Sequence, residues 1–129
     1  MTGMSPTTLV ISGMALGRIA LGIAPFIAAA PAAQLVGFPA EHDNPTTRLM
    51  ARLFGVRDIG LGVLALWGLS NPTALPFVLL FNAFMDAGDL TAIAVPLVRR
   101  QGIDAAAIKS AVLATVGGLG WLTMWLIAR

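Results

Sequence analysis

Four long stretches dominated by apolar residues constrain the fold of this chain more than any other feature. They cover about residues 8–30, 47–70, 73–98 and 106–128. A helix needs roughly 20 apolar residues to cross the hydrocarbon core of a bilayer, and each stretch is long enough. The sequence therefore predicts an all-α integral membrane protein, a four-helix bundle in which each stretch forms one transmembrane helix.

The composition excludes the main alternative, a small water-soluble domain. Only 11% of the residues are charged and 57% are hydrophobic, whereas soluble domains carry about 25% charged residues. The 129 residues suit a single transmembrane domain, residues 1–129. A net charge of only +2 favours contact with membrane lipid over nucleic acid. The absence of cysteine excludes thiolate chemistry and cysteine-ligated metals, and we expect no metal and no cofactor.

The basic residues predict the orientation in an inner or plasma membrane. Arg99, Arg100 and Lys109 flank the third loop and Arg48 flanks the first, whereas the opposite side has only Arg129. Loops rich in arginine and lysine stay in the cytoplasm. We therefore expect the first and third loops in the cytoplasm and both termini outside.

Proline and polar residues predict where the helices begin. Three pairs, Ser5-Pro6, Asn44-Pro45 and Asn71-Pro72, join a good N-cap to a proline at the first helical position. Asp104 is the expected cap of the last helix. Residues 31–46 are expected to form a loop. The connection near residue 71 is so short that the second and third helices are expected to form an antiparallel hairpin.

Small residues predict the faces on which the helices pack, because they let backbones approach closely in lipid. Each seam lies on one helical face: Gly13, Gly17, Ala20, Ala24 and Ala28 in the first helix; Ala51, Gly55, Asp58, Gly62 and Ala65 in the second; Ala107, Ala111, Ala114 and Gly118 in the fourth. Such faces also favour a homo-oligomer.

Ionisable residues from the first three stretches fall at similar depths. Counted at about 1.5 Å per residue from the cytoplasmic ends, five lie roughly 13–18 Å deep, with Arg52 slightly shallower: Arg18, Arg57, Asp58, Asp86 and Asp89. We call these six residues the charged layer. An isolated charge at mid-bilayer costs at least ~2.5 kcal/mol, so we expect three arginines and three aspartates to face inward and neutralise one another.

The third helix contributes a polar stripe to this layer, because Asn82 shares a face with Asp86 and Asp89. The fourth helix has no charge in its span. It is expected to pack behind the layer or to face neighbouring subunits.

The residues of this layer carry a resemblance. An arginine in the first helix, "ARLFGVRDIGLG" in the second and "NAFMDAGDL" in the third resemble an uncharacterised family of small four-helix membrane proteins of bacteria and fungi, grouped as a domain of unknown function. The resemblance covers most of the chain, with a distinctive Arg-x4-Arg-Asp-x3-Gly core. It implies the four-helix fold and a signature of Arg52, Arg57, Asp58, Asp86 and Asp89. It brings no established activity.

One functional reading is a small, cofactor-independent membrane enzyme that isomerises, cyclises or hydrates an apolar, lipid-like small molecule. Two carboxylates near an arginine can divide acid and base roles. In this reading Asp86 or Asp89 is the acid, Asp58 the base and Arg57 the orienting group, while Arg18, Arg52 and Asn82 bind the ligand.

Three other readings remain open. Protonatable side chains within a membrane also serve proton-coupled transport, for which four helices would have to oligomerise. The chain could equally be an accessory subunit of a larger membrane complex. A purely structural role is a buried ion-pair network that fixes helix register.

Overall fold

The computed structural model describes residues 3–129, and every regular element in that range is helical. Five α-helices and one 3-10 helix follow one another: α1 Pro6–Ile27, α2 Ala29–Val36, η1 Ala40–His42, α3 Pro45–Leu69, α4 Leu75–Val98 and α5 Asp104–Ala128. The prediction of an all-α chain is confirmed. The predicted count of four differs from the five α-helices in this range, because the region expected to be the first loop contains α2.

The break between α1 and α2 follows from Pro31. A continuous helix would need the amide of residue 31 to donate to the carbonyl of Ile27, and proline has no amide hydrogen and clashes with that carbonyl. The chain instead turns at Ala28, which adopts φ −137° and ψ 60°. Pro31 then lies in the first turn of α2, where no intrahelical acceptor is available to an amide. The expected helix over 8–30 and loop over 31–46 are therefore wrong at this point.

Two of the predicted helix starts are confirmed. The Ser5 side chain accepts a hydrogen bond from the amide of Thr8 at 3.2 Å, with Pro6 at the first position of α1. Asn44 and Thr47 form a reciprocal capping box at the start of α3. Both caps satisfy amides that have no partner within the helix.

The other two predicted starts are wrong. Residues 72–74 form a turn in which the carbonyl of Asn71 accepts from the amides of Ala74 and Leu75, so α4 begins at Leu75. In α5 the N-cap residue is Ile103, and Asp104 is the first helical residue. At this position its negatively charged carboxylate interacts favourably with the positive end of the helix dipole.

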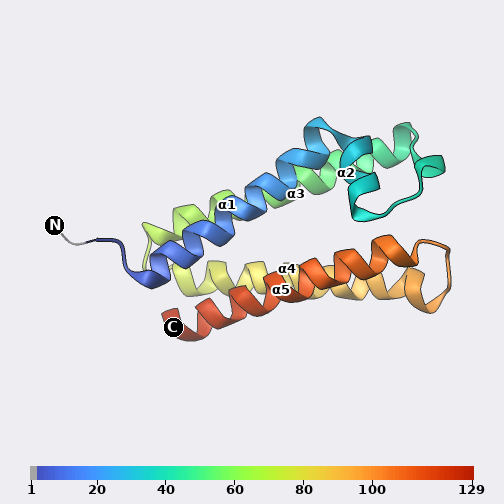
Figure 1. Ribbon diagram of the computed structural model, residues 1–129. Helices are drawn as coiled ribbons and strands as arrows, with labels where there is room; N and C mark the ends of the chain where they lie inside the picture. The colour runs from blue at the N-terminus through green and yellow to red at the C-terminus, as the bar shows by residue number, and fades with distance from the viewer. Residues whose placement is uncertain (1–2) are drawn as a thin grey trace.

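The long helices form two antiparallel pairs, α1 beside α3 and α4 beside α5 (Figure 1). The beginning of α1 and the end of α5 lie at one end of the molecule, and α2 and the α4–α5 connection lie at the other. The pairs are closest near the termini and diverge toward α2. α3 and α4 are antiparallel, as their short connection predicts, but each packs mainly on its other neighbour.

Glycine allows the close approach of α1 and α3. A Cβ added at Gly22 would lie 2.5 Å from the carbonyl oxygen of Gly55, and one at Gly62 would lie 2.7 Å from that of Ala15. The predicted seam through Gly55 and Gly62 is therefore confirmed.

The predicted seam on α1 is wrong. A Cβ at Gly13 or Gly17 would have nothing within 4 Å, and the buried face is that of Ile11, Ala15, Arg18 and Gly22. These four residues share one helical face. The reason is that Arg18 must face inward to meet its partners, and its direction fixes the rotation of the whole helix.

Three helices, α1, α4 and α5, are long and apolar enough to cross a membrane by length and composition. α3 is not among the three, because it carries Arg48, Arg52, Arg57 and Asp58. Large apolar side chains lie exposed on the outer faces, among them Leu16, Phe77, Phe84 and Leu119. Apolar side chains outside and charged side chains inside are what a lipid environment favours, so this arrangement indicates a membrane protein.

Candidate functional site

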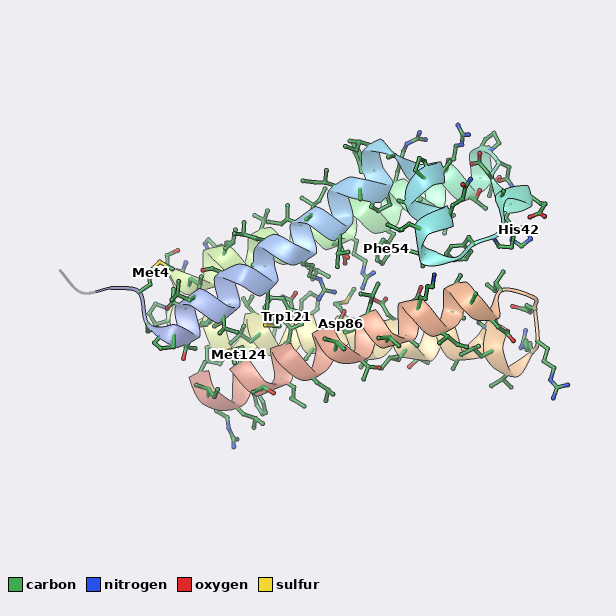
Figure 2. The ribbon with its side chains drawn as sticks, viewed as in Figure 1. Met4, His42, Phe54, Asp86, Trp121 and Met124 are labelled. Carbon is green, nitrogen blue, oxygen red and sulfur yellow. The ribbon has the colours of Figure 1, made fainter. Side chains whose placement is uncertain are left out.

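Four polar or charged side chains are buried where the two helix pairs meet. They come from three helices: Arg18 from α1, Asp58 from α3, and Asn82 and Asp86 from α4. We call these four residues the Arg–Asp cluster. Figure 2 shows Asp86 and Trp121 between the pairs. None of the four residues is more than 7% exposed, so each depends on protein partners for its hydrogen bonds.

Arg18 lies between two carboxylates. Its Nη1 and Nη2 donate to the two oxygens of Asp86 at 3.1 and 2.8 Å, a fork that satisfies both guanidinium and carboxylate geometry. Its Nε lies 3.4 Å from Oδ1 of Asp58. The result is an Asp–Arg–Asp grouping that links α1, α3 and α4, with Arg18 and not Arg57 at its centre.

Arg57 forms a second bridge between the helix pairs. Its Nη2 donates to Oδ2 of Asp89 at 2.9 Å, and both side chains are partly buried. Its guanidinium carbon also lies 5.4 Å from the centre of the Phe54 ring, within the range of a cation–π contact. Arg57 therefore joins α3 to α4 beside the cluster.

Arg52 does not belong to this layer. It is exposed and makes no salt bridge with any residue of the range 3–129. The depth estimate placed it close to the others, but depth does not determine direction. Arg52 lies six positions before Asp58, which turns its side chain about 120° away from the face of Asp58 at 3.6 residues per turn.

The loss of Arg52 changes the charge balance of the layer. Arg18 and Arg57 face Asp58, Asp86 and Asp89, so the interior holds two cations and three carboxyl groups. The expected balance of three against three is therefore wrong. The interior carries one excess negative charge unless one carboxyl group holds a proton.

Three buried polar atoms of the cluster have no hydrogen-bond partner among the described residues: Nε of Arg18, Oδ1 of Asp58 and Oδ1 of Asn82. The amide nitrogen of Asn82 donates to the carbonyl of Val78 on its own helix at 3.1 Å, which leaves the oxygen free. Buried polar atoms are nearly always hydrogen-bonded, so each exception needs an explanation such as water or a ligand. Nε of Arg18 and Oδ1 of Asp58 face each other as an ion pair at 3.4 Å, so their unmet need is only for hydrogen bonds of good geometry. Oδ1 of Asn82 is the atom of the cluster that remains without a partner among the described residues, and it marks the cluster as a candidate binding site.

α5 contributes to the site in a way that the sequence analysis missed. The guanidinium of Arg18 lies 6.0 Å from the centre of the Trp121 ring, and Trp121 is buried. A Cβ added at Gly117 would lie 3.0 Å from Oδ2 of Asp86, and one at Gly118 would lie 3.3 Å from its Cβ. α5 thus packs directly on Asp86. The sequence signal that could have indicated this contact is the Gly117-Gly118 pair, which comes one helical turn before Trp121.

Two hollows in the molecular surface lie away from the cluster. One, of about 300 Å³, is lined by residues at the α4–α5 contact, Leu97, Ile108, Ala111, Val112, Thr115 and Val116. The other, of about 360 Å³, lies where α1 passes into α2, beside Arg48 and Arg52. The structure thus brings Arg18, Asp58, Asn82 and Asp86 together, adds Arg57 and Asp89 beside them, and leaves Arg52 at a separate place.

Comparison with known proteins gives a family and no activity. Neither the curated proteins nor the solved structures contain a match to this chain. One family model, described as a domain of unknown function (DUF4267), matches residues 15–126. The match includes α3, α4 and every residue of the Arg–Asp cluster. The chain belongs to the family of the domain of unknown function DUF4267.

Proposed function

We propose that this protein binds an apolar, lipid-like molecule whose polar end enters the Arg–Asp cluster. The observation that carries the proposal is the buried Oδ1 of Asn82, which has no hydrogen-bond partner among residues 3–129. It accompanies Nε of Arg18 and Oδ1 of Asp58, which meet each other only as an ion pair at 3.4 Å. The three atoms are one donor and two acceptors, so a ligand hydroxyl, or a carbonyl or epoxide oxygen together with a water molecule, can satisfy them. Binding sites for small molecules combine apolar walls with a few convergent polar groups of this kind.

A role in helix register alone accounts less well for the cluster. Each buried polar group left without a partner costs about 1–3 kcal/mol. One buried pair, Arg18 with Asp86, would suffice to fix the register of α1 against α4. Buried ion pairs also add little net stability compared with apolar packing. The additional polar groups therefore favour a site that is completed by a ligand.

We infer that a ligand from the membrane enters between the two helix pairs. The α1–α3 pair and the α4–α5 pair contact each other less than the helices within each pair do. They are joined by the ion pairs of Arg18 with Asp86 and Arg57 with Asp89. The pairs diverge toward the α2 end (Figure 1). At that end α2 contacts α5, since a Cβ at Gly37 would lie 3.2 Å from the amide nitrogen of Ala106, so entry of a lipid-like molecule requires the pairs to separate.

The same site supports acid–base chemistry on the ligand without a cofactor. Both oxygens of Asp86 accept hydrogen bonds from Arg18, and Oδ2 of Asp89 accepts one from Arg57. Asp58 is the carboxyl group whose buried Oδ1 accepts no hydrogen bond from the described residues. Three carboxyl groups face two arginines here, so one carboxyl group has no arginine of its own. In a double-bond isomerisation, protonated Asp58 gives its proton to one carbon, and the Asp58 carboxylate so formed takes a proton from a neighbouring carbon, which moves the double bond and restores protonated Asp58.

Replacing Asn82 with leucine tests the binding proposal. We expect Asn82→Leu to fold and to lose a lipid-like molecule that native mass spectrometry detects on the wild-type protein extracted from membranes. The reason is that the variant keeps the branched shape of the side chain but removes the free Oδ1. Thr123→Val is the matched control, because it removes an exposed polar group that bonds only to its own helix.

The opposite result has a clear meaning. If no site is present, Asn82→Leu removes an unsatisfied buried group and should raise thermal stability with no change in bound molecules. That outcome would contradict the proposal and favour a structural role. A second protein at fixed stoichiometry, with no bound small molecule, would favour an accessory subunit. Proton flux through liposomes that Asp58→Asn abolishes would favour transport.

The proposal includes a fourth span and an orientation. α3 has 25 residues, which extend about 37 Å at 1.5 Å per residue. Its two deepest charges, Arg57 and Asp58, meet partners on other helices, which lowers the cost of placing them in lipid. With four spans and the basic loops inside, both termini lie outside the cell.

Single cysteines test this orientation, because the chain has none of its own. We expect His42→Cys and Gln101→Cys to resist a membrane-impermeant thiol reagent in intact cells and to react after permeabilisation. Met4→Cys, before α1, should react in both conditions. Protection of Met4→Cys together with labelling of the other two would reverse the orientation. Labelling of His42→Cys alone would show that α3 does not span.

A further inference from the structure

The hollow of about 360 Å³ at the α1–α2 break has a composition that the proposed function does not use. Its wall is the Ile27–Pro31 segment on one side and Arg48 with Arg52 on the other. The two arginines are four residues apart, so they lie on one face of α3. A concave surface with two guanidinium groups is suited to an anion.

The backbone in this wall adds to the preference for an anion. α2 begins at Ala29, and its N-cap residue is Ala28, whose side chain cannot accept from the first-turn amides. Those amides have no acceptors within the helix. Together with the helix dipole they favour negative charge at this end. The first residues of α2 and the two arginines thus line the same hollow.

The two arginines are not equally available. Arg48 donates from Nε and Nη2 to the two oxygens of Asp43, at 2.7 Å each. This hydrogen bonding holds the pKa of the Asp43 carboxyl below its usual value, so Asp43 stays ionised at neutral pH and keeps Arg48 engaged. Arg52 has no salt bridge within the range 3–129. Arg52 is therefore the cation in the hollow that has no counter-charge.

The position of the hollow suits an amphipathic ligand. The apolar span of α1 ends at Ile27, so the hollow lies at the level of the lipid headgroups if α1 crosses the membrane. Ile27 is 76% exposed and would contact the upper part of an acyl chain. Planar guanidinium groups match the tetrahedral oxygens of phosphate through paired hydrogen bonds.

We propose that this hollow binds a phosphate group. Arg52 is the main residue that binds it, and Arg48 is a second one, whose ion pair with Asp43 competes with the phosphate. The site is separate from the Arg–Asp cluster and does not depend on its function. The phosphate belongs either to the headgroup of an anionic phospholipid or to a soluble molecule. Ile27 and the depth of the site favour the lipid.

The test measures binding by the full chain in a neutral detergent. The two probes are a short-chain phosphatidylglycerol and inorganic phosphate, each titrated alone and in competition. We expect Arg52→Gln to lower the affinity for phosphatidylglycerol at least about tenfold, the effect of losing charged hydrogen bonds. Asp43→Asn should raise the affinity several-fold, because it releases Arg48. Arg52→Lys should recover only part of the loss, since lysine binds as a point charge.

Arg99→Gln is the matched control. Arg99 is exposed, lies in the α4–α5 connection at the same end of the molecule and is outside the hollow. The Arg99→Gln substitution removes the same charge and should leave the affinity for phosphatidylglycerol unchanged. Equal losses in Arg52→Gln and Arg99→Gln would show a general surface attraction and overturn the proposal, as would the absence of binding by both probes.

The competition decides the source of the phosphate. Displacement of the lipid by millimolar inorganic phosphate would support the site and identify a soluble phosphate as its ligand. Binding of phosphatidylglycerol that inorganic phosphate does not displace would support the site and identify a lipid headgroup. Since Arg52 is exposed and makes no salt bridge with the residues that the structure describes, Arg52→Gln should keep the thermal stability of the wild-type protein, and this is measured alongside.

Discussion

Replacing Arg18 with methionine is expected to destabilise the protein more than any single change at its aspartate partners. Arg18 is the cation shared by Asp58 and Asp86, and all three side chains are buried. Its removal leaves two carboxyl groups in low dielectric without a counter-charge. Breaking a buried ion pair costs about 3–5 kcal/mol, and we expect Arg18→Met to reach at least that range. Reversible unfolding in mixed micelles, or the melting temperature in detergent, measures the loss.

The aspartate variants provide the comparison. Asp58→Asn and Asp86→Asn each leave Arg18 with one carboxylate and also remove the excess negative charge, so each should cost less than Arg18→Met. Adding Asp86→Asn to Arg18→Met should recover part of the lost stability, because one of the two unpaired carboxyl groups disappears. Equal effects of all three single variants would show that Arg18 is not shared and would contradict the assigned geometry.

Replacing Gly55 with valine should have an effect of similar size for a different reason. A Cβ at this position would collide with the carbonyl oxygen of Gly22 and would also lie 3.2 Å from Cβ of Phe26. Backbone oxygen cannot move away as a flexible side chain can, so α1 and α3 would have to separate. Overpacking of a core typically costs 1–3 kcal/mol. We expect Gly55→Val to cost at least about 3 kcal/mol, since the clash is with backbone.

The matched control is Gly60→Val on the same helix. A Cβ at Gly60 would have nothing within 4 Å, so the two variants make the same chemical change at a crossing point and at an open face. The melting temperature in detergent should fall sharply for Gly55→Val and change little for Gly60→Val. If the two variants have the same melting temperature, α3 does not cross α1 at this glycine.

The fold class and the approximate bounds of the helices could be predicted from the sequence because they depend on local composition. Apolar stretches of adequate length gave the four long helices to within a few residues, apart from the end of the first. Two N-caps were correct because Ser5 and Asn44 precede proline and have their amide donors close by. Asn71-Pro72 has the same local pattern and still forms a turn, since the chain must reverse there to start α4.

The rotation of α1 was the point at which sequence reasoning failed. Gly13 and Gly17 form a pattern of small residues as good as that of Gly55 and Gly62, but only the second pair lies at a helix contact. The burial of Arg18 places a different face of α1 against α3 than the one that contains Gly13 and Gly17. This rotation brings Gly22 to the crossing with Gly55. A pattern of small residues shows which faces can pack, and a buried charge decides which face does.

The sequence by itself determined that this chain is helical and apolar, and that Arg18, Asp58, Asp86 and Asp89 had to find partners. Those conclusions need only composition, periodicity and the cost of a charge in lipid. Only the tertiary structure decided the pairings, because they depend on the relative rotation and spacing of helices that are distant in the sequence. It joined Arg18 to both Asp58 and Asp86, paired Arg57 with Asp89, placed Gly117 against Asp86, and left Arg52 at the α1–α2 break.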